Sequence, residues 1–374
     1  MDDTDSPPFR AAETLSRTYT DRTLRVGMLG CGYIAHIHTR AMMRTGAVEV
    51  YAADVDENAA ERLVRTYGGK VEQPTALLRR TDLDVVYLCT PHDVRQVPLM
   101  SLTRSSALVV CEKPLALTGA EAERIGNALG PNRNRVVLAF NQRFMPGVQE
   151  LRSWLGTRTD EARRGRIDVT TPPFLDSWAG TPERGGGALT CIGSHALDLW
   201  RYLLGRQVVR VQAVGSRAHV GDHLEHDTAA LIVEDDAGMI STITLQDSGS
   251  TWWSMGARRM LDIDIRLEKS AARATAVSIT TWDDEASEVL TRAHVDGEAP
   301  DFLEEWGYAA MARAVRSRAE GATDAGRAAG DDVLATLEDG IECAHLVDRA
   351  RRSADSTDAR TPDRRSNQVA GEQL

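Results

Sequence analysis

The chain of 374 residues lacks three features that would point to particular classes of protein. It has no basic excess: 44 Lys and Arg stand against 55 Asp and Glu, the formal net charge is −11, and no basic stripe marks a nucleic-acid surface. Its five cysteines form no C-x-x-C pair, which argues against a zinc site or disulfide scaffold and favours a reducing compartment. No apolar run reaches membrane-spanning length, and the N-terminus lacks the apolar core of a secretory signal. We therefore expect a cytoplasmic protein that binds neither nucleic acid nor a membrane.

The stretch from residue 24 to residue 54 carries the most informative pattern. An apolar run over 24–29 breaks at Gly30-Cys31-Gly32, and a helical pattern begins near Tyr33, Ile34 and Ala35. A second apolar run over 48–53 ends on Asp54. Strand, glycine turn, helix and a terminal acid about twenty residues past the turn are typical of a dinucleotide-binding site.

Each residue of this pattern has a physical task. Gly30 would adopt a turn conformation that a side chain forbids, and Gly32 would let backbone N–H groups approach a pyrophosphate at the helix N-terminus. Asp54 would accept hydrogen bonds from a ribose hydroxyl and repel a phosphate at that place. The sequence therefore predicts binding of NAD, with NADP less favoured.

The chain then alternates between apolar runs of strand length and helical segments as far as residue 140. Such alternation indicates a parallel sheet, whose ligands bind beyond the carboxyl ends of the strands. Distinctive polar groups follow these runs, and with the turn they give the expected cofactor-binding residues: Gly30, Gly32, Tyr33, Ile34, Asp54, Thr90, Pro91, Glu112, Lys113 and Asn141.

The second part of the chain has a different texture. After a triple glycine at 185–187, a helix is expected over 188–204, and the runs at 261–267 and 277–280 alternate apolar with polar residues. With 208–214, 228–233 and 239–245 they predict a large, mainly antiparallel sheet, one face on helices and the other open to solvent or a second subunit.

We therefore expect an α/β protein of two domains with ragged ends. The predicted division is a flexible arm over 1–22, a dinucleotide-binding domain over 23–145, a substrate and oligomerisation domain over 146–352, and a disordered tail over 353–374.

These motifs, in this order, resemble the glucose-fructose oxidoreductase and inositol dehydrogenase (Gfo/Idh/MocA) family. The resemblance rests on the glycine turn and on Thr90-Pro91, Glu112-Lys113-Pro114, Asn141-Gln142-Arg143-Phe144 and Gly193-Ser194-His195-Ala196-Leu197-Asp198. It implies an N-terminal Rossmann domain, a nicotinamide cofactor, and a sugar, amino-sugar or cyclitol-like substrate. It also implies that Lys113 holds the reacting oxygen, that His195 transfers the proton, and that the protein forms a homodimer or homotetramer.

Two places depart from the family pattern. The family has aspartate four residues before the histidine, where this chain has Cys191. After the Thr-Pro pair the family usually has asparagine and, three residues later, histidine; here those positions are His92 and Arg95.

The residue chemistry supports these roles. Oxidation of a secondary alcohol needs a base for the hydroxyl proton and a positive group for the developing alkoxide, which histidine and lysine provide. Cys191, His195 and Asp198 have the i, i+4, i+7 spacing of one helix face, so Asp198 is expected to orient the imidazole of His195.

Four residues are candidates for contact with the substrate: Arg143, Trp178, Cys191 and Asp198. For Arg143 and Trp178, packing between domains is an equal alternative. Cys191 is either a thiolate activated by Lys113 or, as we favour, a small residue lining the pocket. We predict no metal site, because His219, His223, His226 and Asp227 fall in a polar connection before a strand.

The sequence thus predicts an NAD-dependent dehydrogenase or reductase acting on CH–OH groups. Two alternatives stay open: a redox-neutral enzyme of glycosidase or epimerase type that retains its NAD, and a non-catalytic protein that senses NAD.

Overall fold

The computed structural model describes residues 22–158, 161–171, 184, 187–216, 226–247, 260–283, 290–293, 301–321 and 333–358. Residues 1–21 of the predicted arm lie outside the described residues. Trp178, His219 and His223 also lie outside them.

The first sheet has the strand order β15-β6-β5-β4-β1-β2-β3. All its pairs are parallel except β15 with β6. This order reverses direction between β1 and β4, and ligands of such sheets bind at that switch point. Its strands are β1 (Leu24–Leu29), β2 (Val48–Ala53), β3 (Lys70–Val71), β4 (Val85–Leu88), β5 (Leu108–Cys111), β6 (Val136–Leu138) and β15 (Ala335–Thr336).

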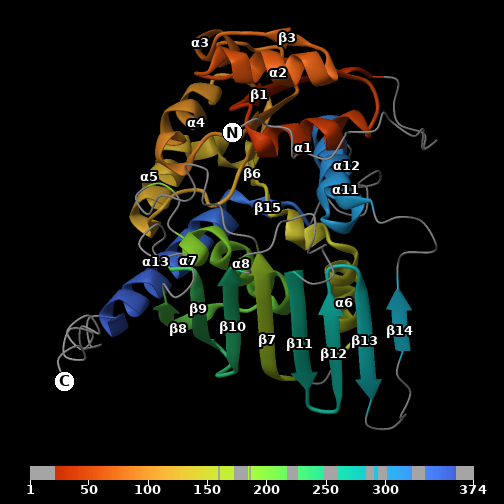
Figure 1. Ribbon diagram of the computed structural model, residues 1–374, viewed down its shortest axis with the longest axis vertical. Coiled ribbons are helices and arrows are strands. Elements are labelled where there is room, and N and C mark those ends of the chain that lie inside the picture. The colour runs from red at the N-terminus through yellow and green to blue at the C-terminus, as the bar shows by residue number, and fades with distance from the viewer. Residues whose placement is uncertain are drawn as a thin grey trace, which may run out of the picture.

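Helices cover both faces of this sheet, as continuous apolar strands require (Figure 1). Asp56 and Thr118 cap two of them by accepting from the backbone N–H groups of Asn58 and Glu121. The helical elements are α1 (Tyr33–Met43), α2 (Glu57–Tyr67), α3 (Pro74–Leu77), η1 (His92–Val94), α4 (Gln96–Leu102), α5 (Gly119–Leu129), η2 (Gly130–Arg135) and η3 (Asn141–Phe144).

The second sheet has the order β14-β13-β12-β11-β7-β10-β9-β8 and is antiparallel except where β7 pairs with β10. The alternating pattern predicted for Leu261, Ile263 and Ile265 is present, since all three are buried on one face. Its strands are β7 (Ala162–Thr171), β8 (Val208–Ser216), β9 (Thr228–Asp235), β10 (Ile240–Asp247), β11 (Leu261–Leu267), β12 (Ser270–Thr275), β13 (Ser278–Asp283) and β14 (Leu290–Ala293).

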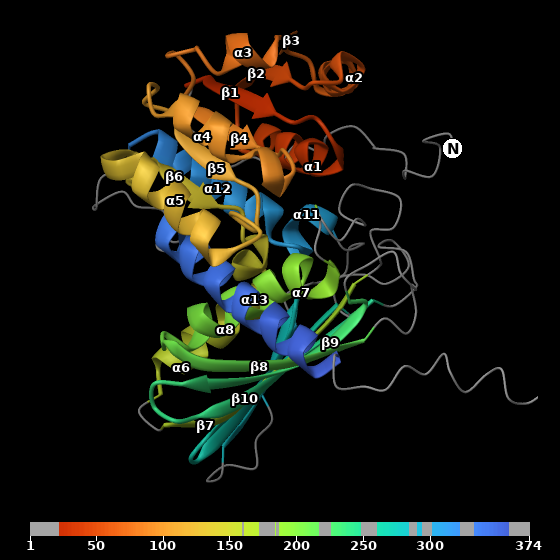
Figure 2. The same cartoon turned by 90° about the vertical axis from the view of Figure 1, so that its left-hand side faces the viewer.

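One face of the second sheet packs on α6 (Pro146–Gly156), α8 (Gly193–Leu204) and α13 (Leu337–Asp358), whereas no described element covers the other face (Figure 2). The short helix α7 (Gly187–Cys191) precedes α8, so the helix expected over 188–204 is broken at Ile192. The predicted fold class is confirmed: the first sheet is mainly parallel and covered by helices, and the second is mainly antiparallel with one open face.

The predicted division of the chain differs from the structure near its end. Helices α11 (Phe302–Glu305) and α12 (Tyr308–Ala319) belong with the first sheet, since α12 packs on α1, and β15 extends that sheet. Helix α13 contacts both α5 and β8, so it links the two sheets. These associations are long-range, and the local pattern on which the division rested does not report them.

The boundary expected for the C-terminal tail is also wrong. Helix α13 continues to Asp358, six residues past the predicted limit of 352. Ala354 is buried, and the hydroxyl of Ser353 accepts from the backbone N–H of Ala213 at 3.0 Å. Contact with β8 therefore orders a segment whose composition resembles that of a tail.

Candidate active site

The glycine turn after β1 leaves no room for a side chain at Gly30. The backbone there has a φ of +86°, and a Cβ would lie 2.8 Å from the carbonyl atoms of Cys89. At Gly32 a Cβ would meet nothing within 4 Å, and α1 begins at the next residue without a side-chain cap. Its N-terminus is thus open and positively polarised, which fits a pyrophosphate. In the first turn, Tyr33 is exposed and Ile34 packs on the core.

Asp54 follows β2 and faces the same turn. One of its carboxylate oxygens accepts from the N–H of Cys31 at 2.6 Å, and the other accepts from the N–H of Asp56 at 2.9 Å. Because a carboxylate has about four lone-pair positions, both oxygens retain capacity for ribose hydroxyls. The side chain therefore fits the recognition of an adenosine ribose.

The ends of β4 and β5 lie beside this turn. Thr90 and Pro91 come just after β4, and Glu112 follows β5. The Glu112 carboxylate pairs with Nε2 of His38 at 2.7 Å and accepts from the N–H of Lys113 at 3.1 Å. Burial alone would raise the pKa of Glu112, but the hydrogen bond to His38 and the neighbouring positive charges outweigh it and hold that pKa below its usual value.

The side chain of Lys113 reaches across to the second part of the chain. Its Nζ donates to the carbonyl oxygen of Cys191 at 2.9 Å and lies 3.5 Å from the Cys191 thiol. Cys191 ends α7, one helical turn before His195 in α8. The structure thus brings together the lysine, the cysteine and the histidine that the sequence singled out.

His195 lies in surroundings that favour the neutral form of its imidazole. Burial and the charge of Lys113 lower its pKa well below the usual value. Its ring stands edge-on to Phe140, with 5.8 Å between centroids. The buried Nδ1 atom has no hydrogen-bond partner within the described part of the chain. A neutral imidazole with an unused nitrogen is suited to accept a proton.

Asp198 does not orient this imidazole, contrary to expectation. Its two oxygens accept from Nε and Nη2 of Arg143, at 2.8 and 2.5 Å, and Asp339 contacts the same guanidinium at 3.2 Å. Arg143 and Asp198 are only 4% and 1% exposed. A buried guanidinium needs a bidentate partner, so the pair joins η3, α8 and α13. Contact of either residue with a substrate stays a prediction.

Asn141 makes a structural contact. Its side chain is buried, and Nδ2 donates to the carbonyl oxygen of Trp306 at 2.9 Å. The residue therefore joins the end of β6 to the segment between α11 and α12, and its contact with a cofactor stays a prediction.

Sequence reasoning assigned no role to two buried residues that contact the strand ends, His38 in α1 and Arg95 after η1. His38 holds Glu112, and Arg95 donates to the carbonyl oxygens of Thr90, Glu112 and Pro114. The sequence did offer one signal for Arg95, because the family that the chain resembles usually has histidine at that position. His92 itself is buried, and burial with the charges of Arg95, Lys113 and Arg184 lowers its pKa to about 2.

No group of three or more His, Cys, Asp or Glu side chains arranged to hold a metal ion occurs among the described residues. His226 and Asp227 are both buried just before β9, so they are not the solvated loop positions that we expected. None of the helices in the described ranges is long and apolar enough to cross a membrane.

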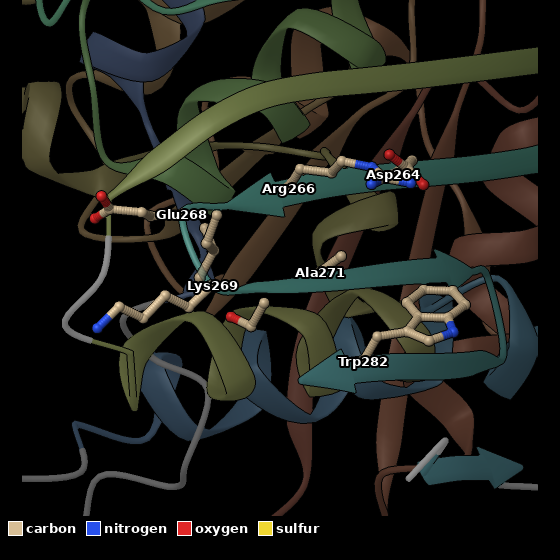
Figure 3. Close-up of a pocket in the computed structure, with 8 residues that line it drawn as sticks. Asp264, Arg266, Glu268, Lys269, Ala271 and Trp282 are labelled. Atoms are coloured by element: carbon tan, nitrogen blue, oxygen red, sulfur yellow. The ribbon is translucent and has the colours of Figure 1, made fainter. Parts of the chain in front are cut away.

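A hollow of about 420 Å³ lies elsewhere, around the turn between β11 and β12 (Figure 3). Asp264, Arg266, Lys269 and Trp282 help to line it. The turn is at the end of the second sheet remote from the first sheet (Figure 1), so this hollow is separate from Lys113 and His195.

Comparison with known proteins gives two matching family models. One is described as an oxidoreductase family with an NAD-binding Rossmann fold and matches residues 24–140. The other is the Gfo/Idh/MocA C-terminal domain and matches residues 161–259.

Individual relatives extend this match. Inositol 2-dehydrogenase of Rhizobium meliloti is 27% identical over 229 residues, covering 59% of this chain and 68% of that protein. D-glucoside 3-dehydrogenase of Escherichia coli is 26% identical over 295 residues, covering 73% of this chain and 82% of that protein.

Solved structures share the fold. A complex of levoglucosan dehydrogenase with NADH and levoglucosan superposes with a TM-score of 0.74 at 18% identity, covering 90% of this chain and 98% of that one. A myo-inositol dehydrogenase from Corynebacterium glutamicum superposes with a TM-score of 0.70 at 20% identity, covering 90% of this chain and 98% of that one.

Proposed function

The chain belongs to the Gfo/Idh/MocA family of oxidoreductases with an NAD-binding Rossmann fold, and from that membership we propose that it interconverts a secondary alcohol and a ketone on a sugar, amino-sugar or cyclitol-like substrate. The relatives support this substrate class, because their names describe action on inositol and on glucosides. It is an NAD-dependent enzyme acting on CH–OH groups.

The residues of the switch point would hold the cofactor. The open N-terminus of α1 at Gly32 would bind the pyrophosphate and Asp54 the adenosine ribose, and Thr90, Pro91 and Glu112 would line the end toward Lys113. When bound, NAD accepts or donates the hydride. The negative charge of Asp54 disfavours the extra phosphate of NADP.

Lys113 and His195 divide the work on the substrate oxygen. In oxidation, the neutral imidazole of His195 removes the hydroxyl proton, and the ammonium of Lys113 stabilises the negative charge that develops on the oxygen. In reduction, the protonated imidazole returns that proton. Burial and the charge of Lys113 lower the pKa of His195, which keeps the imidazole unprotonated before oxidation and makes it a weaker proton acceptor.

One observation carries this proposal: the Nζ of Lys113 bonds to the carbonyl oxygen of Cys191 at 2.9 Å, one helical turn before His195. That contact joins a residue from the end of β5 with the helix of the second sheet. A cation and a base from two separate parts of the chain thus meet past the end of β5, where a substrate would be enclosed.

The test is a screen of cyclitols, sugars and amino sugars with NAD, following the absorbance of NADH. We expect NADH formation with at least one polyol and none with the Lys113→Ala variant. Release of NAD on denaturation without NADH formation for any compound would favour the redox-neutral alternative. If the protein turns over no compound and retains no NAD on purification, but binds added NAD reversibly, a sensor would be favoured.

A further inference from the structure

Three carbonyl groups at the strand ends lie past the last hydrogen bonds of the sheet. The ladder between β4 and β5 closes with the N–H of Glu112 donating to the carbonyl oxygen of Leu88 at 3.0 Å. The carbonyls of Thr90, Glu112 and Pro114 follow on either side of it. Because buried carbonyls require donors, something other than the sheet must supply them.

Arg95 supplies all three. It follows η1, is 2% exposed, and its Nε donates to the carbonyl oxygen of Thr90 at 3.1 Å. Its Nη1 donates to the carbonyl oxygens of Glu112 and Pro114. One planar guanidinium thus ties the end of β4 to the residues immediately before and after Lys113.

The remaining groups around Lys113 are fixed as well. Its N–H donates to the Glu112 carboxylate at 3.1 Å, and His38 holds that carboxylate from the other side at 2.7 Å. The side chain of Lys113 extends away from these bonds and donates to the carbonyl oxygen of Cys191 at 2.9 Å. The negative charge of Glu112 lies near Arg95 and lowers the cost of burying the guanidinium.

We propose that Arg95 is a positioning residue that sets the place of the Lys113 ammonium by holding the backbone on both sides of it. The inference rests on the proposed function, in which Lys113 stabilises the reacting oxygen. A lysine at position 95 keeps the charge but not the planar fork, so it cannot bond to three carbonyls in the same geometry. A glutamine loses the charge and most of the donors.

The test compares Arg95→Lys and Arg95→Gln with the same changes at Arg316. Arg316 is a matched control, since it is also 2% exposed and donates to backbone carbonyls, those of Ala47 and Arg22, but lies against other segments. Two measurements are made: steady-state kinetics, which give kcat and KM with the polyol found active, and amide hydrogen exchange of the peptide spanning residues 108–116.

We expect Arg95→Gln to lower kcat about tenfold or more, because small misplacement of a reacting group is costly, with the Kd for NAD within about threefold of wild type. Arg95→Lys should recover part of that kcat. Exchange of the 108–116 peptide should rise about tenfold or more in Arg95→Gln and stay at the wild-type rate in the Arg316 variants.

Unchanged exchange of the 108–116 peptide in both Arg95 variants would overturn the proposal, as would a loss of kcat equal to that of the Arg316 variants. If Arg95→Gln fails to fold, Arg95→Lys decides by the same two measurements. Faster exchange in a protein whose wild type turns over no polyol would support the positioning of Lys113 and contradict only the proposed reaction.

Discussion

Lys113 and His195 are the two side chains on which the proposed chemistry depends. We expect Lys113→Ala and His195→Ala each to lower kcat by about a hundredfold or more, the usual effect of removing a charge-stabilising or proton-transfer group. Neither residue lies against the glycine turn, so the Kd for NAD should change much less. Steady-state kinetics and a fluorescence titration with NADH measure the two effects.

Lys269→Ala and His345→Ala are the matched controls for these changes. Lys269 lies at the β11–β12 turn and is exposed, and His345 pairs with Glu123 on the surface of α13 and α5. Both controls should keep wild-type kcat. Loss of folding in Lys113→Ala and His195→Ala, seen by circular dichroism, would make the two residues structural.

At Cys191 the backbone matters more than the thiol. The 2.9 Å bond of Lys113 goes to the carbonyl oxygen, which any residue at this position provides, whereas the thiol lies farther away at 3.5 Å. We therefore expect Cys191→Ala to keep kcat within about threefold of wild type. Loss of turnover in Cys191→Ala with NAD binding intact, and inactivation by iodoacetamide in step with modification of Cys191, would instead give the thiol a catalytic role.

Among the elements, the end of β2 and the turn after β1 act as a unit through Asp54. We expect NAD to bind more tightly than NADP, and Asp54→Ser to narrow the ratio of the two Kd values about tenfold or more, since a charged hydrogen bond and a charge repulsion are both lost. Fluorescence titration with NADH and NADPH gives this ratio.

Asp54→Asn separates the charge from the geometry of the turn. Its amide oxygen can still accept from the N–H of Cys31, so the turn bond can persist while the negative charge is removed. The ratio of Kd values should narrow in this variant too. A wild-type preference for NADP would contradict the assignment of Asp54.

The elements themselves were predictable wherever their signal is local. The strands at 24–29 and 48–53 have the predicted bounds, because apolar runs and the glycine turn mark them. The break of the expected helix at Ile192 and the return of α12 and β15 to the first sheet were missed. Those features depend on contacts between distant segments, which no short stretch of sequence reports.

The residues of the site also fall into two groups, those with a local sequence signal and those that depend on distant contacts. Lys113 and His195 were singled out because each belongs to a short motif, and the structure places Lys113 on Cys191, one helical turn before His195. Their catalytic roles stay predictions. The pairing of Arg143 with Asp198 joins residues 55 apart, so helical spacing alone assigned Asp198 to the wrong neighbour. Arg95 bonds to carbonyl groups, which carry no sequence signature at all.

For the whole molecule, the buried histidines make stability depend on pH. His92 has its pKa lowered to about 2 from 6.5 by burial and nearby cations, and that of His195 is also lowered. Below pH 6.5 the unfolded chain binds these protons and the folded chain does not, so stability falls as the pH falls. The loss for His92 alone is about 1.4 kcal/mol per pH unit, or about 3 kcal/mol at pH 4.5.

His92→Asn isolates this contribution. We expect the free energy of unfolding to decrease less between pH 7.5 and pH 4.5 in His92→Asn than in wild type, by about 3 kcal/mol, measured from urea transitions at both pH values. His195→Asn should change in the same direction. Equal decreases in wild type and His92→Asn would mean that His92 takes up a proton in the folded protein.

The open face of the second sheet is the surface on which we expect copies of this chain to meet. Val209, Val214, Ile232 and Ile240 on β8, β9 and β10 are each about half exposed on this face. Apolar side chains gathered on one sheet face are costly in water, so we expect a homo-oligomer that covers them. In sedimentation velocity at micromolar concentration, Ile232→Arg should shift the protein from the oligomer toward the monomer. Val97→Arg, which changes a 72% exposed valine on α4, should leave the oligomer unchanged. A wild-type protein that sediments only as a monomer would show that this face stays open to solvent.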